Sequence, residues 1–170
     1  MIYPLWPAIA LLVFVTFQRV AELGLAQANT KALLARGARE VAPGHYPLIV
    51  LTHAAWLAAL WWLAPGRPVV WPLVAVFLLL QLARVWVIRT LGPRWTTRII
   101  ILPGAPLVTG GPFRYLSHPN YAVVVAELAV LPLAFGLWEI ALIFSVLNAI
   151  VLTVRVRAES AALAQSSSRP

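Results

Sequence analysis

Long apolar runs are the feature that most limits what this chain can fold into. They cover residues 2–20, 47–64, 69–91 and 120–156. A helix needs about 20 apolar residues to cross the hydrocarbon layer of a bilayer, so each of the first three runs has the length of one span. The last run is too long for one span, and Pro132 and Gly136 interrupt it near its middle, so we expect a bend at 136–139. The sequence therefore predicts an all-α integral membrane protein of about five transmembrane helices, the last two a helical hairpin.

Composition supports this fold class and excludes others. The chain is 62% hydrophobic and 11% charged, whereas soluble domains lie nearer one half and one quarter. The net charge of +8 is typical of nucleic-acid binding, but the Arg residues lie between apolar runs and not on one soluble face, so we expect no nucleic-acid partner. The absence of Cys excludes disulfides, cysteine–metal sites and thiol nucleophiles, and we predict no metal site.

The connecting segments divide residues 1–170 into parts of one transmembrane domain. Residues 1–91 should hold the first three spans, 92–163 a loop, the hairpin and a C-terminal motif, and 164–170 a disordered tail. The first run lacks a basic segment before it, which favours a retained span over a signal peptide, although Ala26–Ala28 leaves cleavage open. We expect residues 98–109 to form a short strand, a turn and a second strand on the membrane surface.

The positions of Lys and Arg predict the orientation, because short cytoplasmic loops carry an excess of these residues. They gather after the first and third runs and at the C-terminal end, while Arg67 stands alone after the second run. We therefore expect the N-terminus outside and the C-terminus in the cytosol. The usage of residues, rich in Ala, Arg, Trp and Pro, indicates a GC-rich bacterial genome, so we expect the bacterial inner (plasma) membrane as the location. The basic residues on the predicted cytosolic side are Lys31, Arg36, Arg39, Arg94, Arg98, Arg114, Arg155, Arg157 and Arg169.

Polar side chains inside the apolar runs lie toward the predicted cytosolic side. An ionisable group at the centre of a span costs about 3 kcal/mol on insertion scales and usually marks function. We expect His53, Gln81, Arg84 and Glu127 to share one polar chamber. Structural explanations also exist, since Arg19 and Glu22 are three residues apart on one helix, Arg89 can reach the headgroups, and a lone histidine can simply pack. The polar positions are Gln18, Arg19, Glu22, His53, Gln81, Arg84, Arg89, Glu127, Asn148 and Arg155.

The segment 110–121, Gly-Gly-Pro-Phe-Arg-Tyr-Leu-Ser-His-Pro-Asn-Tyr, is the most informative motif. Its glycines allow a close backbone approach, and Pro119 suits the first turn of a helix, where free amides can bind an anionic or polar group. Tyr115, His118 and Tyr121 can stack on a ring or face a cation. The pattern predicts a polar ligand at a helix start, or else a rigid interfacial turn.

The chain resembles the isoprenylcysteine carboxyl methyltransferase family. The resemblance rests on Gly111-Pro-Phe-Arg-Tyr115, His118-Pro-Asn-Tyr121, the predicted hairpin, and Arg155-Val-Arg-Ala-Glu159-Ser-Ala-Ala-Leu163. The first half, with 38–41 and 45–47, is similar to a bacterial branch found beside type III polyketide synthases, whose members resemble O-methyltransferases of alkylpyrones. Two positions depart from the family pattern: Ser117 stands where Arg is usual, and Ser160 stands where a second Glu is usual.

The resemblance implies S-adenosylmethionine as cofactor, held between the loop before the hairpin and the C-terminal motif. By that match His118, Pro119, Asn120 and Tyr121 line the cofactor site, and Tyr115 lies nearby. Glu159 binds the amino or ribose end of the cofactor, and Arg155 holds the motif together or faces the substrate anion. No Gly-x-Gly-x-x-Gly motif is present, which excludes a soluble Rossmann methyltransferase.

Methyl transfer to an ionised oxygen requires positioning and removal of water more than a strong base. We expect Arg84, Arg89 or Arg155 to hold the oxyanion of a lipophilic acceptor that carries a carboxylate or an acidic hydroxyl. The acceptor would enter from the bilayer and the cofactor from the cytosol. Phospholipid N-methylation, a nicotinamide-dependent reductase of the sterol type and a non-enzymatic small membrane protein remain as alternatives, and oligomeric state is not predicted.

Overall fold

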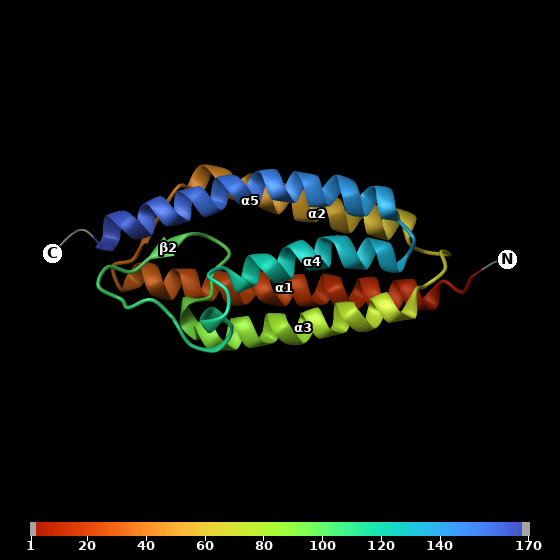
Figure 1. Ribbon diagram of the computed structural model, residues 1–170, viewed down its shortest axis with the longest axis horizontal. Coiled ribbons are helices and arrows are strands. Elements are labelled where there is room, and N and C mark those ends of the chain that lie inside the picture. The colour runs from red at the N-terminus through yellow and green to blue at the C-terminus, as the bar shows by residue number, and fades with distance from the viewer. Residues whose placement is uncertain (1–2, 168–170) are drawn as a thin grey trace.

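The computed structural model describes residues 3–167, except for the side chains of His45 and of residues 160–167. Five long helices run side by side, and the two chain ends lie at opposite ends of the bundle (Figure 1). We call the end with residues 36–45 and 92–118 the loop end, and the end with residues 64–70 and 135–137 the turn end. The elements in order are α1 Trp6–Ala35, β1 Arg39–Glu40, η1 Pro43–His45, α2 Tyr46–Leu63, α3 Trp71–Leu91, η2 Gly92–Arg94, β2 Ile100–Ile101, η3 Gly111–Arg114, α4 Pro119–Ala134 and α5 Trp138–Ser167.

The predicted all-α membrane fold agrees with this architecture. By length and composition, α1, α2, α3 and α5 can each cross a membrane. The remaining long helix, α4, has 16 residues and falls short of the roughly 20 that a span needs. Proline at its first position fixes where α4 begins, and Gly136, at a φ of +67°, lies in the bend that separates it from α5. The hairpin bend, predicted at 136–139, therefore lies at 135–137.

Two helices extend beyond the predicted apolar segments. The first predicted run covers residues 2–20, and α1 continues to Ala35, because residues 21–35 are rich in the strong helix formers Ala, Leu, Glu, Gln and Lys. A disordered tail is predicted at 164–170; α5 is helical through Ser167, and residues 168–170 lie outside the described residues. The C-terminal motif that was expected after the hairpin is therefore part of its second helix.

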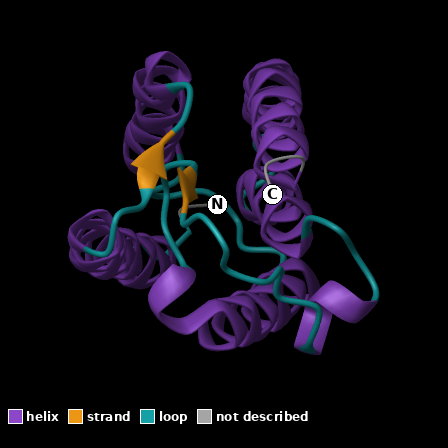
Figure 2. Ribbon diagram, turned by 90° about the vertical axis from the view of Figure 1, so that its left-hand side faces the viewer, coloured by secondary structure: helices purple, strands orange, loops and turns teal. Residues whose placement is uncertain are grey.

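The prediction of a strand, a turn and a second strand at 98–109 is wrong. Only Ile100–Ile101 forms a strand there, and its antiparallel partner is Arg39–Glu40 from the loop after α1. The second predicted arm contains Pro106 and follows Pro103, and proline has no N–H to donate to a ladder. Seen from the loop end, the strands and long connections lie across that end of the bundle (Figure 2). The first and third loops are thus tied together over the helices.

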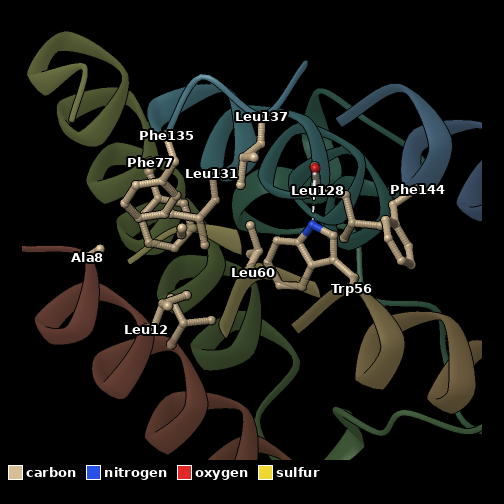
Figure 3. Close-up of a cluster of buried hydrophobic side chains, with 12 residues drawn as sticks. Ala8, Leu12, Trp56, Leu60, Phe77, Leu128, Leu131, Phe135, Leu137 and Phe144 are labelled. Carbon is tan, nitrogen blue, oxygen red and sulfur yellow. Dashed lines mark hydrogen bonds between the residues drawn. The ribbon is translucent and has the colours of Figure 1, made fainter. Parts of the chain in front are cut away.

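The turn end holds the apolar core. All the helices contribute to it, and Figure 3 shows the aromatic and aliphatic side chains of α2, α3, α4 and α5 meeting there. Trp56 is 1% exposed and donates from Nε1 to the carbonyl of Leu128 at 3.3 Å, so this tryptophan is a core residue and not a membrane anchor. The core cluster comprises Ala8, Leu12, Val15, Trp56, Leu60, Ala64, Phe77, Leu128, Leu131, Phe135, Leu137 and Phe144.

Helix α4 differs from its neighbours in how far it is covered. Seven of its 16 residues are buried, and it packs against α3 on one side and α5 on the other. It lies inside the bundle in Figure 1. Because α4 is largely shielded from lipid, it can carry an ionisable side chain at mid-length without exposing it to hydrocarbon.

Candidate functional site

A polar network crosses the bundle at mid-depth, centred on Glu127 of α4. The Glu127 side chain is 0% exposed. Its Oε1 accepts hydrogen bonds from Gln81 Nε2 at 2.8 Å and from Arg84 Nε at 2.9 Å. Its Oε2 accepts from Arg19 Nη2 at 2.6 Å and also from Arg84 Nη2. One carboxylate therefore joins α1, α3 and α4.

A second carboxylate completes the charge balance of this network. Glu22 Oε2 accepts from Arg19 Nη1 at 3.0 Å and from Arg84 Nη1 at 3.2 Å. Gln18 Nε2 donates to Glu22 Oε1 at 2.9 Å and to Gln81 Oε1 at 2.6 Å. Two guanidinium groups and two carboxylates thus share their hydrogen bonds, and the network is neutral overall. Such pairing is what allows four ionised groups to remain below about one-fifth exposure.

A cavity of about 300 Å³ lies beside the network and extends toward the loop end. Side chains from α1, α2, α4 and α5 form most of its wall, and Arg84 of α3 and the segment 95–97 contribute the rest. Much of the wall is aliphatic, including Val20, Leu57 and Val124. The polar and charged groups that line it are Thr16, Arg19, Glu22, Tyr46, His53, Arg84, Trp95, Thr96, Thr97, Asn120, Tyr121, Asn148 and Arg155.

At the loop end of the cavity, the two predicted motifs meet. Tyr121 donates its hydroxyl proton to Glu159 Oε2 and accepts from Arg155 Nε at 2.8 Å. Arg155 also donates from Nη1 to the carbonyl of Thr97 at 2.7 Å, which fixes segment 95–97 against α5. The His118 ring stacks on Tyr121 with a centroid separation of 5.2 Å. The motif before α4 and the motif on α5 are therefore in direct contact.

Two amides in this cavity have buried atoms without a hydrogen-bond partner. They are Asn120 Oδ1, an acceptor, and Asn148 Nδ2, a donor. A buried polar atom without a partner costs about 1–3 kcal/mol, so such atoms in a cavity wall favour a polar ligand or water there. The two amides line the same cavity from α4 and α5, two helices that pack against each other.

Two other predicted site residues do not line this cavity. Pro119 and Tyr115 line a separate, mostly apolar groove of about 280 Å³ between α3 and α4. Tyr115 is 75% exposed there. The Gly111 backbone has a φ of +57°, and a Cβ at this position would lie 2.6 Å from Thr90 Oγ1, so only glycine allows the motif to approach α3 so closely.

The predicted polar chamber is present in part. Gln81 and Arg84 each donate a hydrogen bond to Glu127, as described above. His53 lines the same cavity as Arg84, but it is hydrogen-bonded to its own helix, from Nδ1 to the carbonyl of Ile49 at 2.8 Å. Arg89 is exposed on α3 and does not line the cavity, whereas Arg84 and Arg155 do.

The sequence did not single out the loop residues that close the cavity. Tyr46 at the start of α2 shares a hydrogen bond of 3.1 Å with Thr97, and the Arg98 guanidinium lies 4.3 Å from the centre of the Tyr46 ring. Trp95 is 3% exposed, and its carbonyl accepts from Asn29 of α1 at 2.8 Å. The first and third loops come together through the pairing of β1 with β2 and through the ion pair of Arg98 with Glu40 at 2.8 Å, which no local sequence pattern predicted.

Comparison with known proteins identifies one family. A sequence model of the isoprenylcysteine carboxyl methyltransferase (ICMT) family matches residues 73–165, which hold most of α3, the motif loop, α4 and most of α5. The chain is also similar to an uncharacterized protein of Bacillus subtilis (strain 168), YpbQ, with 35% identity over 95% of this chain and 98% of that protein. No solved structure matches the chain.

Proposed function

Since the chain belongs to the isoprenylcysteine carboxyl methyltransferase family, we propose that it is a membrane-embedded, S-adenosylmethionine-dependent O-methyltransferase of a lipophilic acceptor. The observation that carries this proposal is the cavity between the helices, with charged groups at its loop end and aliphatic walls deeper in the bundle. A charged cofactor and an apolar acceptor need such a divided chamber. A volume of about 300 Å³ is at the lower end of ligand sites, which suits a chamber where the reacting ends of two molecules meet.

The loop end of the cavity fits the cofactor. S-adenosylmethionine, when bound, supplies a methyl group on a positively charged sulfur. Arg155 of the cavity wall offers a guanidinium for the carboxylate of its amino-acid end, and Glu159, which is hydrogen-bonded to Tyr121 of that wall, offers a carboxylate for the ammonium. The unpartnered Asn120 Oδ1 and Asn148 Nδ2 give one further acceptor and one further donor in the same wall. Tyr121 holds Arg155 and Glu159 in place through its hydroxyl group.

The deeper part of the cavity fits a lipophilic acceptor. Aliphatic residues of α1, α2, α4 and α5 surround it, and the bundle around them is exposed to the bilayer. Closure against water there would leave the acceptor oxygen poorly solvated and close to the methyl group, which are the two conditions that favour displacement at carbon. The contribution of these aliphatic residues is therefore positioning and exclusion of water.

The same proposal places the loop end in the cytosol of a bacterium. All the Lys and Arg residues at 31–45 and 92–118 belong to that end, and Arg67 is at the turn end. The excess of positive charge on the cytoplasmic side of short loops then gives a cytosolic entrance for the cofactor in the plasma membrane.

Methyl transfer tests the reaction. Purified protein in lipid nanodiscs is incubated with S-adenosylmethionine labelled in its methyl group and with a lipid extract of bacterial membranes. We expect label in a lipophilic product and calorimetric binding of S-adenosylhomocysteine. Absence of labelled lipid would overturn the proposed function.

Substitutions at the motif contacts test the cofactor site. Glu159→Gln and Tyr121→Phe should each weaken S-adenosylhomocysteine binding about tenfold, because each removes a charge or a hydrogen bond worth about 1–1.5 kcal/mol. The matched controls are Glu139→Gln, at the exposed start of α5, and Tyr3→Phe, exposed at the turn end. Equal affinities of all four variants for S-adenosylhomocysteine would show that the cofactor does not bind at this end of the cavity.

A further inference from the structure

We propose that the methyl acceptor carries a neutral hydroxyl group, and that His53 is the catalytic residue that takes up its proton. This inference rests on the proposed function and names the acceptor class of the same cavity. It concerns the deeper end of the cavity, where His53 of α2 and the Glu127-centred network lie.

The tautomer of His53 follows from its hydrogen bond. Its Nδ1 lies 2.8 Å from the carbonyl oxygen of Ile49. A carbonyl oxygen only accepts, so the proton of the neutral ring is on Nδ1. The remaining ring nitrogen, Nε2, then has a free lone pair. His53 lines the cavity, and its Nε2 is neither fully buried nor hydrogen-bonded among the described residues. This lone pair is therefore available to a ligand. An imidazole in this state accepts a hydrogen bond from a hydroxyl group and can take its proton.

The charge balance of the network disfavours a carboxylate acceptor at the deeper end of the cavity. Arg19 and Arg84 line the cavity, but each donates to both Glu22 and Glu127. No positive charge of this network is left without a carboxylate. An incoming carboxylate would lose its hydration and meet two carboxylates already bound to the same guanidinium groups, which is unfavourable. A neutral hydroxyl group avoids this cost.

Arg155 is not placed to change this conclusion. It lies at the loop end of the cavity, where it is bonded to Tyr121 and Thr97, and there it faces the charged end of the cofactor in the proposed arrangement. The acceptor and the cofactor carboxylate therefore meet different ends of the chamber. The hydroxyl-bearing head of the acceptor would face His53, with its apolar body against residues such as Leu57 and Val50.

The chemical step is balanced without a further reactant. A lone pair of the acceptor oxygen forms the bond to the methyl carbon, and the carbon–sulfur bond breaks with its electrons remaining on sulfur. The O–H proton passes to His53 Nε2. The imidazolium then returns the proton to water after the product leaves. The charged or titratable groups that line the cavity around His53 are Arg19, Glu22, Tyr46, Arg84, Tyr121 and Arg155, and Glu127 lies behind Arg84.

The stability of the labelled product toward alkali tests the acceptor class. The product of the nanodisc reaction is treated with mild alkali, which releases the label of a methyl ester as volatile methanol and leaves a methyl ether intact. We expect alkali-stable label on oxygen. Volatile label, with S-adenosylhomocysteine binding intact, would overturn the neutral-hydroxyl acceptor but not the proposed function. Label on an amine would overturn the O-methyl part of the function and this inference together, and S-adenosylhomocysteine binding without any labelled lipid would overturn both.

Variants of His53 test its role in proton uptake. His53→Phe keeps a ring of similar size and His53→Gln keeps polarity, and neither can accept the proton. We expect each to lower kcat about 100-fold or more while the affinity for S-adenosylhomocysteine stays within about twofold. In the wild type, kcat should fall at acid pH as His53 becomes protonated, and this limb should be lost in His53→Gln.

The control removes a similar contact on the same helix. Thr52 donates to the carbonyl of Leu48 at 2.8 Å, four residues back as for His53, but does not line the cavity. Thr52→Ala should keep both kcat and its pH profile. A wild-type kcat in His53→Phe or in His53→Gln, or a pH limb that survives in His53→Gln, would overturn the role of His53.

Discussion

The two halves of this bundle bury very different side chains. Toward the turn end, Trp56, Phe77, Leu131 and Phe135 belong to one buried apolar cluster that fills the space between the helices. Toward the loop end, the same helices enclose a cavity lined by charged and amide groups, next to a network of four ionised side chains. The halves share the same five helices, so the difference arises from which residues face inward at each depth.

This contrast shows what each half contributes. In lipid, apolar side chains gain little from leaving one apolar environment for another, so the turn end is held by close packing. At mid-depth, Glu127, Arg19 and Arg84 can be stable only together, because each alone would be a charge in hydrocarbon. The turn end therefore fixes the helices relative to one another, and the loop end uses that rigid frame to hold polar groups around a cavity.

The largest effect is expected from removing the carboxylate at the centre of the network. Glu127→Ala leaves Arg19 and Arg84 buried with one carboxylate between them, and we expect a loss of about 3–5 kcal/mol in the free energy of unfolding. Denaturant unfolding in detergent micelles, followed by circular dichroism, measures it. Glu139→Ala at the exposed start of α5 is the control. Equal stabilities of the two variants would show that the network does not hold the helices together.

A smaller effect is expected in the apolar half. Leu131→Ala removes a fully buried side chain of α4 and should cost about 2 kcal/mol, the low end of such substitutions, since lipid replaces water as the reference environment. The same unfolding measurement applies, with Leu82→Ala on the lipid-facing side of α3 as control. A cost larger than that of Glu127→Ala would reverse the order of the two halves.

The motif loop should respond to a single methyl group. Gly111→Ala places a residue with a side chain at positive φ and brings its Cβ to 2.6 Å from Thr90 Oγ1, so we expect a loss of about 1–2 kcal/mol. Gly44→Ala, where a Cβ meets nothing within 4 Å and φ is not positive, is the control. Adding Thr90→Ala should recover the part of the loss that comes from the collision. No recovery would assign the whole cost to the backbone.

The smallest change in stability is expected inside the cavity. Asn148→Leu replaces an amide whose Nδ2 has no partner by an apolar side chain of similar size, which should leave the free energy of unfolding within about 1 kcal/mol of the wild type. Methyl transfer to lipid extract should nevertheless fall, because the cavity wall loses its donor. A large loss of stability would mean that the amide has a structural partner.

Much of the fold could be predicted from local patterns. Apolar runs of span length and the interruption at Pro132 and Gly136 depend on the residues themselves, and the helices appear where these patterns lie. The ends of α1 and α5 could not be predicted in the same way, since hydropathy marks where a helix leaves hydrocarbon and not where it stops. The pairing of Arg39–Glu40 with Ile100–Ile101 joins residues some 60 positions apart and has no local signal.

The candidate site divides along the same line. The sequence by itself determined that this is a membrane protein, that polar groups lie at depth in its helices, and that the segments around His118-Pro119 and Arg155 to Glu159 carry a family motif, because residue type and spacing along the chain are sufficient for each. Only the tertiary structure decided that Arg84 is neutralised by Glu127 and Glu22, that Arg89 faces away from the cavity, and that His53 keeps a free nitrogen toward it. The physical reason is that charge balance and hydrogen bonding depend on which helices pack together, and helices several turns long bring residues from distant parts of the chain to the same depth.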